Sequence, residues 1–379
     1  MLTTLAVAGY RSLCNLVVPL EQLTVITGAN GSGKSSLYRS LRLLAATARD
    51  GAIAALAREG GLASTLWAGP ERPGGGAGKR STPIALKLGF ASDDDGFGYA
   101  IDFGIPTPSA HTMFNDDPEI KAESVWSGPI LRPATLLTER QNSLVRLRGD
   151  EGWRRHERSL PPWASVLGEV ADPATAPELL TLRDILRSWR FYDSVRTDAD
   201  APARRSPVAT RTPVLSGDGA DLAAALQTVR ELGDPDRLDD AISAAFPGSR
   251  LTLTPADGGL SLGLRQPGLL RPLTAPELSD GTLRYLVWVA ALLSPRPAPL
   301  LVLNEPETSL HPSLLEPLAE LIAGASSDSQ IVVVSHAAPL VDALAGQGAL
   351  RHELEKRNGE TVVAGRDLLD QPAWKWPSR

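Results

Sequence analysis

Near its beginning the chain reads Gly28-Ala29-Asn30-Gly31-Ser32-Gly33-Lys34-Ser35. The β-branched run at residues 23–27 precedes this stretch and is typical of a buried strand. The stretch is followed by residues 35–48, where Leu37, Leu41 and Leu44 share one face and predict a helix. A glycine-rich turn between a strand and a helix points backbone N–H groups at an anion, and the helix N-terminus adds partial positive charge. The stretch therefore predicts a phosphate-binding site in an α/β fold.

The spacing of this turn matches the Walker A motif, in which two glycines separated by four other residues are followed by Lys and Ser or Thr. Lys34 is expected to reach the β- and γ-phosphates of ATP, and the Ser35 hydroxyl is expected to bind Mg²⁺. An ordinary glycine turn is the alternative, and the flanking strand and helix argue against it. The predicted ATP site is completed by Asn30, Gly31, Ser32, Gly33 and Ser36.

Bulk composition narrows the class of protein. A chain of 379 residues holds two domains, or one domain with a large insertion. Its net charge of −6 argues against a surface coated for nucleic acid, although a local basic patch stays possible. The single cysteine, Cys14, excludes an intramolecular disulfide and favours the cytoplasm. Prolines interrupt the most apolar stretch, residues 285–303, so we expect no membrane span and no membrane partner.

The pattern of elements predicts one α/β core built from both ends of the chain, residues 1–108 and 277–379, with an inserted α+β lobe at 109–276. Recurrent prolines in the middle exclude a long coiled coil. The Gly- and Pro-rich residues 70–83 are expected to form a mobile loop. Strands are expected at residues 84–90, 99–105, 144–148, 251–254, 260–264 and 330–334, and helices at 178–189, 220–232, 235–245 and 283–293.

A second motif closes the apolar strand at residues 299–303, which is followed by Asn304 and Glu305. The carboxyl ends of strands in an open parallel sheet face the ligand crevice, so Glu305 is placed to accept a proton from the water that attacks the γ-phosphate. The alternative is a buried strand that meets a solvated loop.

A third motif, Leu278-Ser279-Asp280-Gly281-Thr282, precedes the helix predicted at 283–293. Ser279 can cap that helix, and Gly281 lets the backbone approach a ligand, so this N-terminus can hold an anion. Taken alone, Ser-Asp-Gly is also a common turn.

The order of these motifs resembles that of ABC-type ATPases. Residues 278–282 resemble their Leu-Ser-Gly-Gly-Gln signature, residues 308–312 their D-loop, and residues 330–336 the strand that ends in the switch histidine. The opening residues 5–13, with Gly9-Tyr10-Arg11-Ser12, resemble the start of RecF-, SMC- and OLD-type heads. Residues 304–312 resemble most closely the RecF-like ATPases of bacteria. The resemblance covers both ends of the chain, and the middle is placed only by its position.

The resemblance implies a P-loop NTPase fold with a mixed sheet, in which two heads meet head to tail around two ATP molecules. Ser279 and Gly281 of one subunit would touch the γ-phosphate that Lys34 of the other holds. Glu305 would be the general base, and His336 would steady the γ-phosphate or the water. Arg11 and Ser12 would lie near the nucleotide. ATP binding would drive homodimerisation, in the service of DNA repair or defence against foreign DNA, with DNA or an effector protein as a further partner.

The chain departs from this pattern in two places. Asn304 stands where the family usually has Asp, and an amide offers Mg²⁺ a dipole instead of a full charge, so we expect weaker Mg²⁺ retention or slow turnover. The Q-loop is not assigned, and Glu123 and Gln141 are candidates by location.

Because 379 − 336 = 43 residues follow His336, too few for the nuclease domain of OLD-type proteins, no nuclease is expected in this chain.

Two other functions stay open. A non-hydrolysing, ATP-gated scaffold would follow from Asn304, and a transporter ATPase subunit is disfavoured by the opening phrase and the proline-rich middle.

Other residues have structural interpretations. We expect solvated faces at residues 154–158 and at Arg204-Arg205, and an anchor for the C-terminal segment at Trp374 and Trp376. His311 either starts a helix before Pro312 or reaches across a dimer interface.

Overall fold

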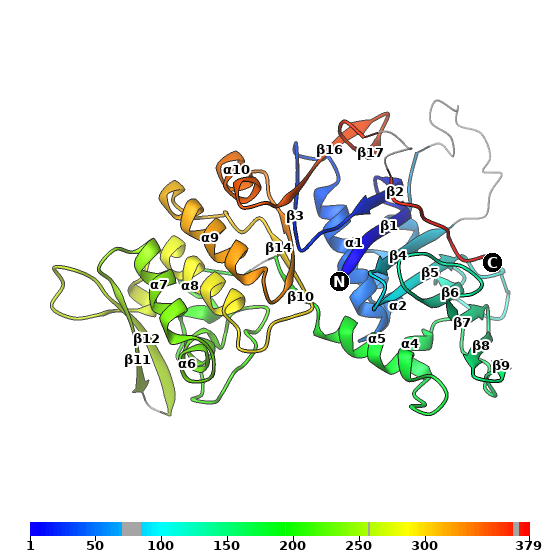
Figure 1. Cartoon of the computed structure of the whole chain (residues 1–379), viewed down its shortest axis with the longest axis horizontal. Coiled ribbons are helices and arrows are strands. Elements are labelled where there is room, and N and C mark those ends of the chain that lie inside the picture. The colour runs from blue at the N-terminus through cyan, green and yellow to red at the C-terminus, as the bar shows by residue number, and fades with distance from the viewer. Residues whose placement is uncertain (70–84, 194, 257, 367–370) are drawn as a thin grey trace. The chain divides into compact units, whose positions relative to one another are not determined.

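The structure, a computed structural model, describes residues 1–69, 85–193, 195–256, 258–366 and 371–379 (Figure 1). The loop predicted at 70–83 lies outside the described residues. The chain forms two compact units. Unit 1 comprises Met1–Glu21, Ile26–Trp189 and His352–Arg379, and unit 2 comprises Gln22–Val25 and Arg190–Arg351. Residues 109–276, expected as one inserted lobe, therefore contribute to both units, and the assignment of ATP binding to 1–108 and 277–379 stays a prediction.

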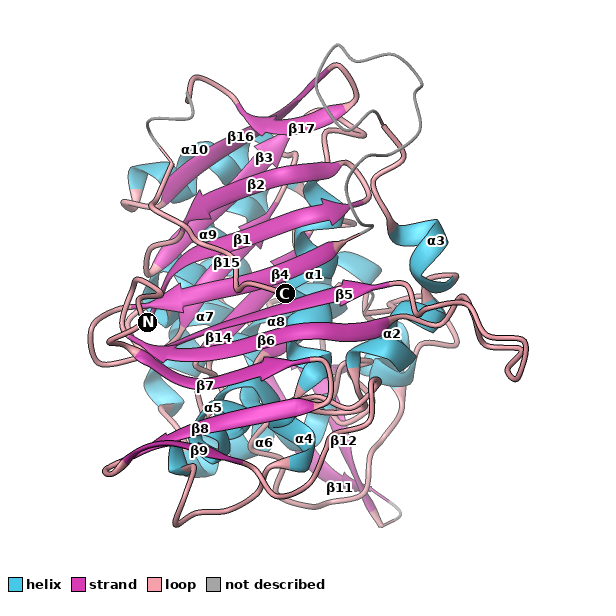
Figure 2. Cartoon of the chain, turned by 90° about the vertical axis from the view of Figure 1, so that its right-hand side faces the viewer, coloured by secondary structure: helices cyan, strands magenta, loops and turns pink. Residues whose placement is uncertain are grey.

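Unit 1 is built on an antiparallel sheet with the strand order β2-β1-β4-β5-β6-β7-β8-β9 (Figure 2). Its strands are β1 (Leu2–Tyr10), β2 (Leu13–Pro19), β4 (Leu86–Ser92), β5 (Phe97–Gly104), β6 (Glu119–Ser127), β7 (Leu136–Gln141), β8 (Leu144–Gly149) and β9 (Gly152–Arg155). Nearly every residue of the central strand β5 is buried, so both faces of the sheet are covered there.

One face of this sheet carries helices and the other carries the C-terminal segment. The helices of unit 1 are α1 (Lys34–Thr47), α2 (Ala52–Arg58), α3 (Gly61–Thr65), α4 (Val166–Glu169) and α5 (Pro177–Ser188), and α1 packs against β1 and β4. On the opposite face Trp374 and Trp376 pack against Ala91, Ala100 and Trp126. A β-carbon at Gly89 would lie 2.6 Å from the Trp374 ring, so that strand leaves room for the indole. The predicted anchoring of the C-terminal segment is confirmed.

Unit 2 contains the parallel strands β10 (Arg190–Tyr192), β14 (Leu300–Asn304) and β15 (Gln330–Val334). In their register Asn304 is opposite Val334, so the residues that follow β14 and β15 leave the sheet at the same edge. The strands β3 (Leu23–Gly28) and β16 (Leu350–Arg357) each begin in unit 2 and end in unit 1, where β16 pairs with β17 (Glu360–Val363).

Unit 2 also contains helices. They are α6 (Leu222–Leu232), α7 (Pro235–Ala245), α8 (Asp280–Leu292), α9 (Leu315–Ala325) and α10 (Ala338–Gly346), with the 3₁₀ turns η1 (Pro202–Arg204), η2 (Ala275–Glu277) and η3 (Pro312–Leu314). A small antiparallel sheet adds β11 (Arg250–Ala256), β12 (Gly259–Arg265) and β13 (Leu273–Thr274). All residues of α8 from Tyr285 onward are buried, as expected for a helix at the centre of a core. Within the described residues, no helix is long and apolar enough to cross a membrane.

Candidate functional site

The glycine-rich turn in unit 1 connects β3 to α1. Gly28, Gly31 and Gly33 have φ values of 143°, 77° and 111°, which other residues rarely adopt, so the three glycines are required by the path of the loop. Helix α1 begins after Gly33 with no side-chain cap and no acidic residue in its first turn. Its first N–H groups and its positive dipole end are thus left for an external anion.

Lys34 and the serines of this turn supply the remaining donors. The Lys34 ammonium is mostly buried and donates to the carbonyl oxygens of Gly28 at 2.6 Å and Ala29 at 3.0 Å. Ser35 is exposed in the first turn of α1, and within the described part of the chain the buried Ser32 Oγ has no hydrogen-bond partner. Ammonium, hydroxyl and backbone N–H groups are the chemistry that holds polyphosphate, and an exposed hydroxyl is a hard oxygen ligand for Mg²⁺. The residues present fit both groups.

A residue that the sequence did not single out braces this turn. Thr361 of β17 is almost fully buried, and its Oγ1 lies 2.7 Å from the carbonyl oxygen of Ser32 and 2.8 Å from Ser12 Oγ. A hydroxyl has one proton, so Thr361 donates to the carbonyl and accepts from Ser12. Ser12, expected near the nucleotide, is thus connected to the loop through Thr361.

Arg11 is held by a neighbouring acid. Its Nη2 lies 2.6 Å from Glu59 Oε2, which also accepts from the Tyr10 hydroxyl at 2.7 Å. Burial, together with the hydrogen bond to Glu59, raises the pKa of Tyr10, which keeps the hydroxyl a donor. The position of Arg11 near a nucleotide stays a prediction.

In unit 2 the structure brings Glu305 and His336 together at the carboxyl edge of the parallel strands. His336 Nδ1 lies 3.6 Å from Glu305 Oε1, and the Glu305 side chain is 43% exposed. Glu305 has a φ of 50°, an uncommon conformation for a residue with a side chain and one that often marks a functional turn. This arrangement offers a carboxylate with free acceptor capacity beside an imidazole.

Glu307 fixes the position of His336. The sequence analysis did not single out Glu307, and the only feature of the sequence that points to it is its place two residues after Glu305. Its side chain is 8% exposed, and its Oε1 lies 3.3 Å from His336 Nδ1. The same oxygen accepts from Ser335 Oγ at 2.7 Å and from the backbone N–H groups of His336 and Ala337 at 3.1 and 3.3 Å. Charge-assisted bonds of this kind lock the loop that carries the histidine.

The signature-like turn of unit 2 caps α8. Ser279 is exposed, and its Oγ accepts from the N–H of Thr282 at 3.1 Å. Further along α8, Trp288 Nε1 donates to the carbonyl of Pro306 at 2.9 Å, which ties the helix to the loop that follows Glu305. The capping role expected of Ser279 is therefore observed.

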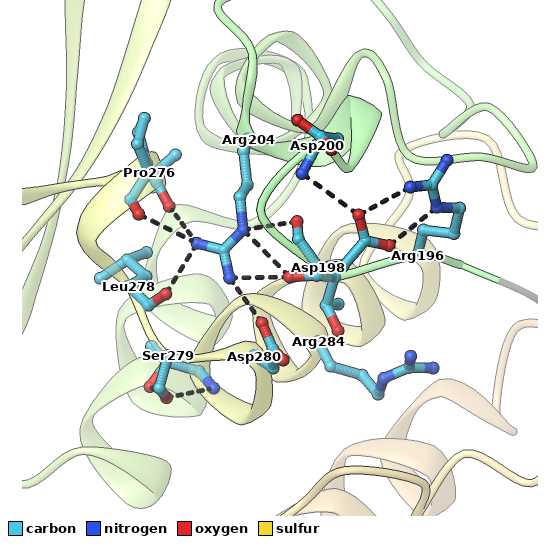
Figure 3. Close-up of polar contacts among 12 residues, drawn as sticks. Arg196, Asp198, Asp200, Arg204, Pro276, Leu278, Ser279, Asp280 and Arg284 are labelled. Atoms are coloured by element: carbon cyan, nitrogen blue, oxygen red, sulfur yellow. Dashed lines mark hydrogen bonds and ion pairs between the residues drawn. The ribbon is translucent and has the colours of Figure 1, made fainter.

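Two expectations are wrong. Arg204 is not on a solvated face, because its side chain is 8% exposed and pairs with Asp280 at 2.6 Å (Figure 3). Glu123, a Q-loop candidate, is fully buried in an ion pair with Arg140 at 3.0 Å, so it holds β6 to β7 and is not open to a nucleotide. Arg204 was assigned to a solvated face because a charged side chain is usually exposed, and Glu123 was a candidate by its location alone.

The other candidates lie as follows. Gln141 is exposed at the end of β7 and stays a Q-loop candidate by location. His311 caps η3, where its Nδ1 accepts from the N–H of Ser313 at 3.2 Å, which supports the helix-start role. Arg154 and Arg155 are exposed, as expected of a solvated face, and so is Arg205.

Among solved structures, an Smc head bound to the C-winged helix domain of ScpA is 17% identical, with a TM-score of 0.53, and 97% of this chain and 98% of that chain are covered. The Smc head domain with a coiled coil and joint from Pyrococcus yayanosii is 11% identical, with a TM-score of 0.49, and 97% of each chain is covered. The first likeness shows the fold, which is the mixed α/β P-loop NTPase fold of an Smc head.

No curated protein matches the chain. The family model described as "AAA domain, putative AbiEii toxin, Type IV TA system" matches residues 23–342, which include the glycine-rich turn, the Ser279 turn, Glu305 and His336. An AAA-family ATPase domain implies binding and hydrolysis of ATP. Since the match extends over most of this chain, the chain belongs to the family described as AAA domain, putative AbiEii toxin, Type IV TA system.

Proposed function

We propose that this chain is a slow, Mg²⁺-dependent ATPase, a RecF-like ABC-type head that closes head to tail with a second copy when ATP binds. The observation that carries the proposal is the pairing of Glu305 with His336 at the carboxyl edge of β14 and β15. A half-exposed carboxylate beside an imidazole can accept a proton from water. The match to an AAA domain indicates that the substrate is ATP.

Each residue has a role in this proposal. Lys34 and the turn from Asn30 to Ser36 hold the phosphates, and Ser35 and Asn304 hold Mg²⁺, which neutralises phosphate charge when bound. Glu305 takes the proton of the attacking water, and His336, fixed by Glu307, orients that water or the γ-phosphate. The reaction then depends on positioning and charge stabilisation, without a covalent intermediate.

The Ser279 turn supports the dimer. Ser279 is exposed at the N-terminus of α8, a helix of 13 residues whose dipole favours an anion. In a head-to-tail pair, Ser279 and Gly281 would meet the γ-phosphate held by Lys34 of the second copy. Turnover would then require two chains.

For the cellular process, the description of the family names a putative toxin, which favours defence against foreign DNA over DNA repair. The solved Smc head binds a domain of another protein, so an effector protein is a candidate partner here too. DNA is the other candidate.

The non-hydrolysing scaffold is the second candidate function, and Asn304 is the observation that favours it. An amide at the end of β14 binds Mg²⁺ more weakly than a carboxylate would. This function requires tight ATP binding without phosphate release.

The test is Mg²⁺-dependent phosphate release as a function of protein concentration. We expect specific activity to rise with concentration and to fall at least about a hundredfold in Lys34→Ala and in Glu305→Gln. Glu316→Gln, which changes an exposed glutamate in the first turn of α9, is the matched control and should keep wild-type activity. ATP binding with no release above the Glu305→Gln background would reject hydrolysis and favour the scaffold.

A further inference from the structure

Arg204, the last residue of η1, is the most extensively bonded buried cation of unit 2 among the described residues (Figure 3). Its Nε and Nη2 donate to the carbonyl of Thr197 at 3.0 and 2.7 Å, and Nε also lies 2.9 Å from the carbonyl of Asp198. Its Nη1 donates to the carbonyls of Ala275 and Leu278 at 2.9 and 2.7 Å. These bonds use the whole planar fork of a guanidinium.

The acceptors identify what Arg204 holds. Ala275 and Leu278 lie directly before the Ser279 turn, and Asp280, whose Oδ1 accepts from Nη2 at 2.6 Å, lies inside it. The turn is thus attached to a segment 76 positions earlier in the chain. A second hydrogen bond connects the same two segments in the other direction: Arg284 Nη2 of α8 donates to the carbonyl oxygen of Val195 at 2.8 Å. Residues 195–204 and the start of α8 are therefore fixed to each other from both sides.

The ion pair also changes the charge of the turn. Asp280 stands where the resembled signature has its first glycine, and its carboxylate is 57% exposed. A free carboxylate at this point would repel a phosphate that approaches the N-terminus of α8. Arg204, held at 2.6 Å from it, offsets that negative charge.

We propose that Arg204 is a positioning residue of the composite ATP site. It holds the Ser279 turn in shape and cancels the charge of Asp280, so that the turn can receive the γ-phosphate of ATP bound to a second copy. The expected effect of Arg204 on catalysis rests on the proposed function. Its effect on the shape of the Ser279 turn is independent of that function.

The experiment compares the full chain with Arg204→Gln and Arg204→Lys. The matched control is Arg196→Gln, which removes an exposed arginine of the same segment that pairs with Asp198. We expect amide hydrogen exchange of residues 278–283 to accelerate at least about tenfold in Arg204→Gln and not in the control. We also expect kcat to fall at least about tenfold while the ATP dissociation constant stays within about twofold, because the P-loop is untouched. Arg204→Lys keeps the charge without the fork, so it should lower kcat too and keep the chain folded.

A second variant isolates the charge. In Arg204→Gln the added change Asp280→Gly removes the repelling carboxylate and should recover kcat by at least about threefold. Wild-type exchange in residues 278–283 of both Arg204 variants would overturn the bracing role, and wild-type kcat in both would overturn the catalytic one. If the unmodified chain neither associates with ATP nor releases phosphate, the proposed function fails, and the exchange data still decide whether Arg204 braces the turn.

Discussion

The carbonyl oxygen of Ser309 lies so close to Gly281 that a β-carbon at residue 281 would be 2.8 Å from it. The two residues belong to different motifs, the Ser279 turn and the D-loop-like stretch. Ser309 has a φ of 64°, so the backbone is bent at the point of approach. The absence of a side chain at residue 281 is therefore what lets the two loops touch.

Gly281→Ala should separate these loops. Because the obstructing atom belongs to the backbone, we expect a loss of about 1–3 kcal/mol in the free energy of unfolding and a lower kcat. Urea unfolding and phosphate release measure the two effects. Gly346→Ala is the control, since a β-carbon there meets nothing within 4 Å in α10, and it should be neutral or slightly stabilising. Wild-type stability in Gly281→Ala would mean that the loops can move apart at little cost.

Thr361→Val should weaken ATP binding through the shape of the phosphate loop. The substitution keeps the volume and removes the hydroxyl, which leaves the Ser32 carbonyl and the Ser12 hydroxyl without their partner. We expect a loss of about 1–3 kcal/mol in the free energy of unfolding and a raised ATP dissociation constant. Thr361→Ser should retain both, and Thr181→Val, at an exposed threonine of α5, should change neither. Calorimetric titration with ATP decides, and equal affinity in the Val and Ser variants would rule out the brace.

The comparison with the sequence shows which kinds of structure are visible in local patterns. The helix predicted at 235–245 agrees with α7 to the residue, and its start has local signals, since Asp234 caps it and Pro235 begins it. The strand and the helix that flank the turn of residues 28–35 were predicted to within one residue at each end, since strand, glycines and helix are contiguous. Thr361 has no such signal, because it acts on Ser32 from 329 positions away.

For Arg204 a local signal exists, but it is misleading. An arginine pair in a proline-rich stretch is typical of a solvated loop, and Arg205 is indeed exposed. Arg204 is instead buried, and its guanidinium donates to backbone carbonyls of two segments, at residues 197–198 and 275–278. Its bonds depend on two segments that only the tertiary fold brings together. The boundary between Trp189 and Arg190 was also missed, because it lies inside the single lobe expected at 109–276, whereas α5 and β10 belong to different units.

His352 should make the stability of the chain depend on pH. It is almost fully buried, and its Nε2 lies 2.8 Å from the carbonyl of Pro19, so Nε2 carries the proton. Among the described residues its buried Nδ1 has no partner, and burial lowers the pKa of His352 below its ordinary value near 6.5. Protonation then favours the unfolded chain. The stabilisation is complete above about pH 6.5 and is lost as the pH falls from there to the folded pKa.

The measurement for His352 is the free energy of unfolding in urea between pH 7.5 and pH 5. The slope that His352 contributes is at most one proton, or about 1.4 kcal/mol per pH unit. His352→Gln can still donate to Pro19 and should flatten the curve, whereas His111→Gln, at an exposed histidine, should leave it unchanged. An equally steep curve in His352→Gln would assign the pH dependence to other groups.

Asn304→Asp should strengthen the use of Mg²⁺. Asn304 is the last residue of β14, directly before Glu305, and a carboxylate there would add a full negative charge where the amide offers only a dipole. We expect the Mg²⁺ concentration for half-maximal phosphate release to fall about three- to tenfold, with a higher kcat. Asn142→Asp, at the exposed turn between β7 and β8, controls for the change in net charge and should have no effect. An unchanged Mg²⁺ requirement in Asn304→Asp would exclude residue 304 from the metal site. Release that begins only in this variant, with ATP bound tightly by both, would instead mean that the natural amide keeps the chain from hydrolysing, as the scaffold function requires.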